Sequence, residues 1–261
     1  MRKRFPRIAA VHQDVPFRKF IPNALTLLGL CTGATAIRFA LSGHWQAAVI
    51  AIVAAAVLDA MDGRIARLLG LESKFGAQLD SLADLVSFGI APSVLVYMWT
   101  LYHSGGAGWT IAMVFCACCA IRLARFNTQA SEDGEEHAPT SYFSGVPAPA
   151  AACLILLPML LSFQAPVAFL RDPFFNGGWM ALISVLMVSR LPTLSLKNLY
   201  VPRHLAAPVI AVVAGLVLCI VVWPWATLSA AALIYFGALP FGSRPPGPIR
   251  QSFTRPPQPP V

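Results

Sequence analysis

Apolar stretches about as long as a lipid bilayer is thick recur along almost the whole 261-residue chain. A helix needs roughly 20 apolar residues to cross the hydrocarbon core. Only 11% of the residues are charged, whereas a typical soluble domain has about 25%. Backbone groups in lipid must be hydrogen-bonded within their own segment, so each stretch is expected to be a helix. The sequence therefore predicts an all-α polytopic membrane protein with about eight transmembrane helices, at residues 21–41, 46–69, 76–102, 109–125, 147–163, 177–189, 205–222 and 226–239.

The 19 lysines and arginines predict how these helices are oriented. With the N-terminus in the cytoplasm and eight spans, only Arg38 and Arg171 fall toward the far side of the membrane. Basic residues are retained on the cytoplasmic side of membrane proteins. This bias predicts an N-in, C-in protein of the cytoplasmic (inner) membrane. The sixth span is the shortest, and losing one span would place later basic loops on the wrong side.

The chain divides into a membrane domain and two polar ends. Residues 1–19 form a basic cytoplasmic segment, residues 20–241 the transmembrane domain, and residues 242–261 a tail rich in Pro and Arg that we expect to be disordered. A cleaved signal peptide is the alternative for the first apolar run, but that run exceeds the usual 7–15 residues. The net charge of +8 does not indicate nucleic acid, because the basic residues flank apolar runs. The six cysteines lie inside apolar runs and do not indicate a zinc site or a disulfide framework.

Four of the eleven carboxylates lie at membrane depth within one short segment. Asp59 and Asp62 are three residues apart on the second predicted span, and Asp80 and Asp84 are four apart on the third. Residues at these spacings share a helix face. Because the turn near residues 70–74 is short, the two spans are expected to be antiparallel neighbours with their acids facing each other. Charged Asp is costly in a bilayer and marks a functional site by default.

A cluster of carboxylates with small neighbours predicts a divalent-metal site. Small residues flank both pairs and let membrane helices approach closely. Hard oxygen ligands suit Mg²⁺, Mn²⁺ or Ca²⁺, and two ions bridged by carboxylates would suit phosphoryl displacement. Cations nearby, among them Arg67 and Lys74, fit a phosphorylated substrate. Snorkelling to the headgroups is the alternative for such cations and is preferred for Arg64.

The segment resembles the signature of the CDP-alcohol phosphatidyltransferases, D-x2-D-G-x2-A-R-x8-G-x3-D-x3-D. All of its fixed positions are present: Asp59, Asp62, Gly63, Ala66, Arg67, Gly76, Asp80 and Asp84. Further segments resemble the phosphatidylserine synthase branch, at residues 21–33, Ser87–Pro92, Ile121–Asn127, Tyr142–Ala152 and Leu186–Lys197. The resemblance covers residues from about 20 to 200.

The resemblance implies a phosphotransferase that moves the phosphatidyl group of CDP-diacylglycerol to L-serine, giving phosphatidylserine and CMP. It also implies a homodimer embedded in membrane lipids. The expected metal ligands are Asp59, Asp62, Asp80 and Asp84, with Asp84 also the general base. We expect the CDP-lipid to contact Asn23, Thr26, Gly63, Arg67 and Gly76, although Asn23 can instead cap the first helix. The serine site is expected to include Arg122, Arg125, Asn127 and Ser144.

Two alternatives remain at the level of the sequence. The same aspartate signature serves other acceptors, namely glycerol 3-phosphate, inositol or choline. An ion-coupled transporter would use buried acids differently, but such proteins often have internal repeats and helices broken near the midplane. The sequence shows neither, and its acids lie toward one membrane face, where a lipid and a water-soluble acceptor can meet.

Overall fold

The computed structural model describes residues 20–71, 73–132, 143–189, 192–193, 215 and 218–239. The predicted basic segment 1–19, the tail 242–261 and most of the predicted span 205–222 lie outside these residues. The described helices are α1 (Phe20–Leu41), α2 (Trp45–Leu68), α3 (Lys74–Asp84), η2 (Leu85–Ile90), α4 (Ala91–Trp99), η3 (Leu101–Ser104), α5 (Gly105–Glu132), α6 (Ala148–Ile155), α7 (Leu157–Ser162), η4 (Ala168–Arg171), α8 (Pro173–Val188) and α10 (Pro224–Ala238).

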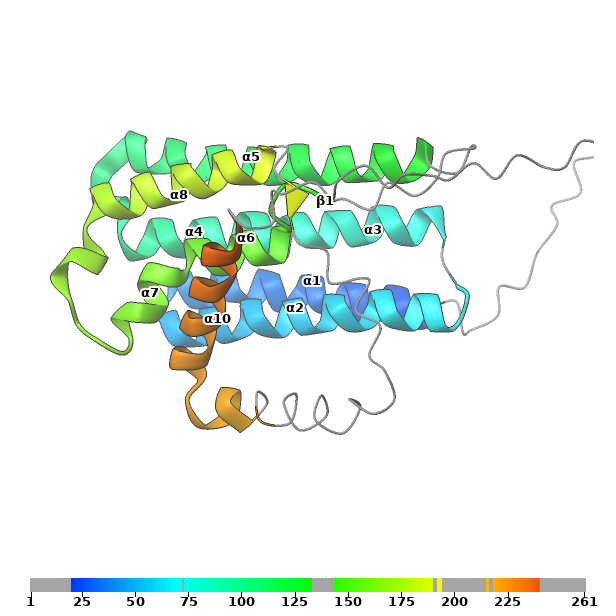
Figure 1. The fold of residues 1–261 in the computed structure, drawn as a ribbon, viewed down its shortest axis with the longest axis horizontal. Coiled ribbons are helices and arrows are strands. Elements are labelled where there is room, and N and C mark those ends of the chain that lie inside the picture. The colour runs from blue at the N-terminus through cyan, green and yellow to red at the C-terminus, as the bar shows by residue number, and fades with distance from the viewer. Residues whose placement is uncertain are drawn as a thin grey trace, which may run out of the picture.

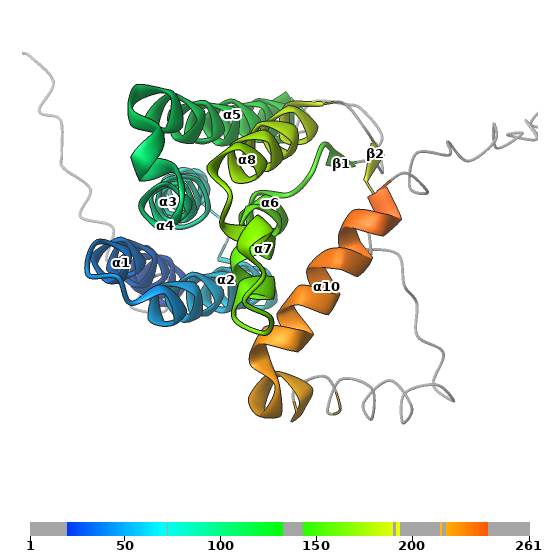
Figure 2. The ribbon, with the colours of Figure 1, turned by 90° about the vertical axis from the view of Figure 1, so that its left-hand side faces the viewer.

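The long helices form a bundle and run along one common direction (Figure 1). Viewed end-on, α1 and α2 form one side, α5 and α8 the opposite side, and α3 with α4 runs between them (Figure 2). The core is apolar and contains the buried side chains of Phe88, Leu95, Phe115, Met159 and Ile183. The prediction of an all-α protein is confirmed, apart from a ribbon of two residues per strand described below.

Three described stretches are long and apolar enough to cross a membrane, namely Ile21–Leu41, Lys74–Trp99 and Leu101–Thr128. Together with the acid-bearing α2, they match the first four predicted spans. Helix α10 covers most of the predicted span 226–239, but it crosses the bundle at a steep angle to the long helices (Figures 1 and 2). The membrane character therefore stands, while the count of eight spans stays a prediction.

Two turns with the same hydrogen-bond pattern connect the first three long helices. After α2, the backbone N–H of Gly70 donates to Arg67 and that of Leu71 donates to Ala66. After α1, Gly43 and His44 donate in the same way to Ala40 and Phe39. Both glycines have positive φ, at 61° for Gly70 and 72° for Gly43, which the Schellman end of a helix requires. These turns make α1, α2 and the third long helix successively antiparallel, with α1 packed against both α2 and α3 and with α2 packed against η2 and α4.

The third long helix is not a uniform α-helix. Between α3 and α4, residues Leu85–Ile90 form a π-helix, which starts directly after Asp84. Single π turns are rare and are frequently found at functional sites. Helix α1 approaches this turn very closely, because a Cβ on Gly33 would lie 2.8 Å from the Cα of Ser87. The Ser87 hydroxyl donates to the carbonyl of Gly29, one turn earlier on α1. This crossing fixes the position of Asp84 relative to α1.

A short ribbon lies near the ends of α5 and α8. Strands β1 (Phe143–Ser144) and β2 (Pro192–Thr193) pair antiparallel, with Phe143 opposite Thr193. The residue after β1 is Gly145, with φ of 88°. A Cβ there would lie 2.6 Å from the carbonyl oxygen of Met187 near the end of α8. Glycine at this position therefore lets the ribbon pass directly against α8.

Candidate active site

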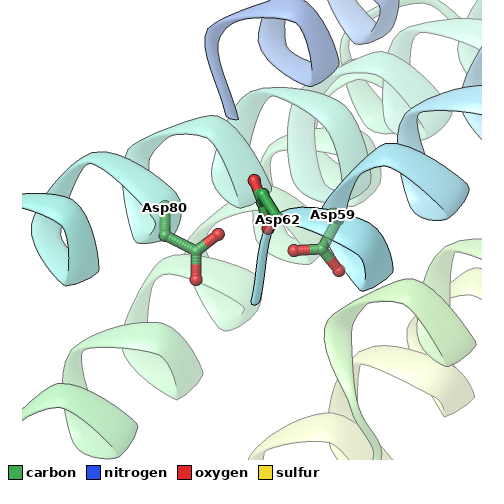
Figure 3. A group of neighbouring side chains, drawn as sticks. All are labelled: Asp59, Asp62 and Asp80. Carbon is green, nitrogen blue, oxygen red and sulfur yellow. The ribbon is translucent and has the colours of Figure 1, made fainter. Parts of the chain in front are cut away.

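Three aspartates from two helices converge beside α1. Asp59 and Asp62 come from α2, and Asp80 of α3 points toward them (Figure 3). One carboxylate oxygen from each residue lies within 4.8 Å of the other two. Asp62 is buried, and Asp59 and Asp80 are half-buried. The predicted facing of the two acidic pairs is therefore present in the structure.

Asp84 lies at the edge of this group. It is half-buried and lies one helical turn after Asp80 on α3. Its carboxyl group lies against that of Asp59. It does not belong to the set within 4.8 Å. It also interacts electrostatically with Arg122 of α5. Asp84 therefore has both the clustered acids and a cation among its neighbours.

The four acids have little compensating charge of their own. No described lysine or arginine forms a salt bridge with any of them, and half-buried like charges at this separation repel each other. A cavity of about 10 Å³ lies among these side chains, and it is also lined by Thr26, Gly29 and Ser87. About 10–15 Å³ of such volume holds one water, so there is room for a single small ion. Carboxylate oxygens suit a hard divalent cation. The residues present therefore fit the predicted metal.

Thr26 of α1 is part of this arrangement. Its hydroxyl group donates to Asp62 Oδ2 at 2.6 Å and lies 3.1 Å from the carbonyl of Pro22. In the structure Thr26 orients a carboxylate, and its predicted contact with the nucleotide stays a prediction. Asn23 lies inside α1, which begins at Phe20, and its Oδ1 would lie 3.2 Å from a Cβ on Gly76. Gly76 thus lets the start of α3 approach Asn23.

The other residues predicted to bind the CDP-lipid lie at the open end of α2. A Cβ on Gly63 would have nothing within 4 Å among the described residues. Packing within the described fold therefore does not require glycine there. Arg67 is exposed, and its Nε donates to the carbonyl of Gly63, one turn back on α2. Both residues are thus free to meet a ligand from outside the bundle.

Of the predicted serine-binding residues, Arg122 is the one beside the acids. It is half-buried on α5 and interacts electrostatically with Asp84. Arg125 is exposed, and its Nη1 donates to the carbonyl of Val188 at the end of α8, 3.1 Å away. This bond ties α5 to the negative end of the α8 dipole.

The other two residues predicted to bind serine, Asn127 and Ser144, are not placed beside Arg122 by the structure. Asn127 Nδ2 donates to Ser81 Oγ at 2.9 Å in a groove of about 340 Å³ between α3 and α5. Asn127 lies five positions after Arg122 in the sequence, a spacing that places the two side chains on different faces of α5. The structure therefore does not bring Asn127 to Arg122. Ser144 lies in β1, and the position of its side chain is outside what the structure describes.

Comparison with known proteins assigns the class. A model of the CDP-alcohol phosphatidyltransferase family matches residues 19–190. The chain belongs to this family, and the aspartates of the site are the acids of its signature. Proteins named CDP-diacylglycerol–serine O-phosphatidyltransferase are similar to the chain. One from Mycobacterium leprae (strain TN) is 38% identical over 224 residues, covering 85% of this chain and 74% of the relative.

Two further relatives with the same name come from distant bacteria. The Helicobacter pylori (strain J99) protein is 39% identical over 170 residues, which cover 65% of this chain and 70% of the relative. The Bacillus subtilis (strain 168) protein is 35% identical over 173 residues, covering 66% and 88% respectively. The family model's match at residues 19–190 spans the aspartate site and the helices around it, from α1 to α8.

Proposed function

We propose that this protein transfers the phosphatidyl group of CDP-diacylglycerol to the hydroxyl group of L-serine. The products are phosphatidylserine and CMP. The observation that carries the proposal is the convergence of Asp59, Asp62 and Asp80, with Asp84 beside them, in a chain of this family. The printed names of the similar bacterial proteins support serine as the acceptor.

The clustered acids are proposed to hold the metal. Asp59, Asp62 and Asp80 would bind Mg²⁺ or Mn²⁺ together with Asp84, with Ca²⁺ the alternative. The sequence predicts two ions, whereas the cavity among these side chains has room for one. Bound there, a divalent ion supplies charge neutralisation at the phosphoryl oxygens. The open position at Gly63 lets the nucleotide approach the α2 backbone, and Arg67 offers a guanidinium to its phosphates.

The remaining steps belong to residues on the acceptor side. Asp84 accepts the proton of the serine hydroxyl while the serine oxygen forms the new bond to phosphorus. The bond between that phosphorus and the CMP oxygen breaks, and CMP leaves with the electron pair. Arg122, beside Asp84, supplies the positive charge that the serine carboxylate requires. The acceptor is thus held between Asp84 at the end of α3 and Arg122 on α5.

The membrane arrangement is proposed from the basic residues. The protein would have its N- and C-termini and its active site on the cytoplasmic side of the inner membrane, with eight spans. The resemblance to the family further implies a homodimer. Chemical labelling of single cysteines placed at Ser42 and Ser73 in sealed cells tests the orientation, because the first lies at the far end of α2 and the second at the acidic end.

The activity is tested with purified protein, Mn²⁺ or Mg²⁺, CDP-diacylglycerol and labelled serine. We expect CMP release and labelled lipid in equal amounts, loss of both with a chelator, and loss of turnover in Asp84→Asn without loss of the fold. Offering serine, glycerol 3-phosphate, inositol and choline together identifies the acceptor. Incorporation of another acceptor in place of serine would overturn the assignment. Serine uptake into sealed vesicles without lipid synthesis would instead support a transporter.

A further inference from the structure

Two buried polar atoms have no hydrogen-bond partner among the described residues, the Nε of Arg122 and the hydroxyl of Tyr235. Buried polar side chains in folded proteins are nearly always bonded. The structure follows this rule elsewhere, since buried Ser93 and Ser184 each donate to the backbone carbonyl four residues earlier, and buried Asn176 donates to two carbonyls. Because an unpaired buried donor costs free energy, this pair requires an explanation.

The two orphan atoms belong to one place in the molecule. The Arg122 guanidinium interacts electrostatically with both Asp84 and the Tyr235 phenol. Tyr235 lies on α10, which crosses the bundle and packs against α6 and α7 (Figure 2). It is half-buried and packed against the apolar core. A helix beyond the family match at 19–190 thus places a hydroxyl group beside the cation of the site.

We propose that Tyr235 and Arg122 together form the subsite that binds the carboxylate of the acceptor amino acid. This inference rests on the proposed function. An Arg Nε–H can only donate, and a Tyr hydroxyl donates readily. A carboxylate brings two acceptor oxygens, so one such group satisfies both orphan donors at once. Charge-assisted bonds of this kind are short and strong.

The position of the pair favours the carboxylate of the acceptor over the phosphates of the lipid. The hydroxyl oxygen of serine is separated from its carboxylate carbon by only two carbon atoms. The group that holds the carboxylate must therefore lie close to the base that takes the hydroxyl proton. Arg122 meets this condition through Asp84. Gly63 and Arg67, proposed for the phosphates, lie on α2 instead.

The decisive variant is Tyr235→Phe, which removes one oxygen atom and keeps the ring. Since that oxygen has no described partner, the melting temperature should not fall. We expect the KM for serine to rise about tenfold, with the KM for CDP-diacylglycerol and kcat within about twofold of the parent. Tyr97→Phe is the matched control. Tyr97 is on α4 and is also half-buried, but its ring packs against the rings of Tyr102 and Trp109. Its serine KM should be unchanged.

A binding measurement separates recognition of the carboxylate from a structural role. Serine should raise the melting temperature of the parent protein in the presence of Mn²⁺ and CMP, which leaves no phosphatidyl group to transfer, and it should do so less in Tyr235→Phe. Ethanolamine lacks the carboxylate, so any shift it causes should be equal in the two proteins. The role of Tyr235 would be overturned if Tyr235→Phe reduced the melting-temperature shifts caused by serine and by ethanolamine equally, or if its KM for serine were unchanged. A parent protein that makes no labelled lipid from serine would instead count against the proposed function.

Discussion

The two halves of the site are built in different ways. The metal half takes its four acids from a single stretch, Asp59–Asp84, folded into one helical hairpin. The acceptor half joins Arg122 on α5 to Tyr235 on α10, which are more than a hundred residues apart in the chain. The first half is a consequence of helix spacing and one tight turn, whereas the second depends on how distant helices pack. Variants in the two halves should therefore affect different kinetic constants.

The largest effect is expected at the metal half. Asp59→Asn should lower kcat/KM by about 1000-fold, because several kcal/mol of charge stabilisation in the transition state are lost with the ion. Without added metal its melting temperature should not fall, since one of the repelling carboxylates is gone. Asp172→Asn is the control, because Asn also caps helices well and Asp172 caps α8 far from the site. Retained metal-dependent activity in Asp59→Asn would break the contrast between the halves.

The next effect is expected at the acceptor half. Arg122→Ala should raise the KM for serine by about 10- to 100-fold, since a hydrogen bond to a charged group contributes about 1.5–3 kcal/mol. The KM for CDP-diacylglycerol should change little. Among the described residues, Arg125→Ala loses the bond to the Val188 carbonyl, so it should lower the melting temperature slightly and leave the serine KM near that of the parent. If the two variants raise the serine KM equally, the assignment of the pocket to Arg122 is wrong.

A smaller effect is expected from the hydroxyl that supports the metal half. Thr26→Val removes the donor to Asp62 Oδ2. Partners of metal ligands typically contribute 10- to 100-fold in metal affinity, so the Mn²⁺ concentration for half-maximal activity should rise about tenfold. Thr35→Val is the control on the same helix, because the Thr35 hydroxyl donates to the carbonyl of Cys31, one turn back on α1, and not to an aspartate of the site. Equal metal requirements in the two variants would contradict the role given to Thr26.

The smallest effect concerns the open position on α2. Gly63→Ala should fold at least as well as the parent, because Ala favours helices over Gly by about 0.5–1 kcal/mol. The KM for CDP-diacylglycerol should rise roughly fivefold, the low end of the cost of an extra methyl group in a filled space. Gly33→Ala is the control and should be less stable than the parent, since its methyl group would collide with Ser87. It should lower the melting temperature. Normal lipid kinetics in Gly63→Ala would separate this glycine from the nucleotide.

The metal half was predictable because its rules are local. Spacings of three and four residues place Asp59 with Asp62 and Asp80 with Asp84 on common faces, and a Gly-containing turn makes the two helices antiparallel. The structure brings Asp59, Asp62 and Asp80 together, with Asp84 beside them. The helical nature of the first four apolar runs followed from their length and composition in the same way.

The acceptor half was not predictable to the same degree. Arg122, Arg125 and Asn127 are close in sequence, yet one faces Asp84, one bonds α8 and one bonds Ser81 on α3. Tyr235 was missed because the direction in which α10 crosses depends on its packing against α6 and α7. A polar aromatic residue inside an apolar run was the only available signal. The π-helix after Asp84 likewise has no marker in the sequence.

The depth of the acids along their helices has a consequence for how the lipid is handled. Asp80 lies six residues from the start of α3, or about 9 Å at 1.5 Å per residue. Each methylene costs about 0.8 kcal/mol to expose to water, so pulling two acyl chains out of the bilayer would be prohibitive. On the proposed function, carboxylates within the first two turns of an apolar helix would act on a lipid that stays in its leaflet, so that the lipid would arrive by lateral diffusion and the departing nucleotide would cross into solution.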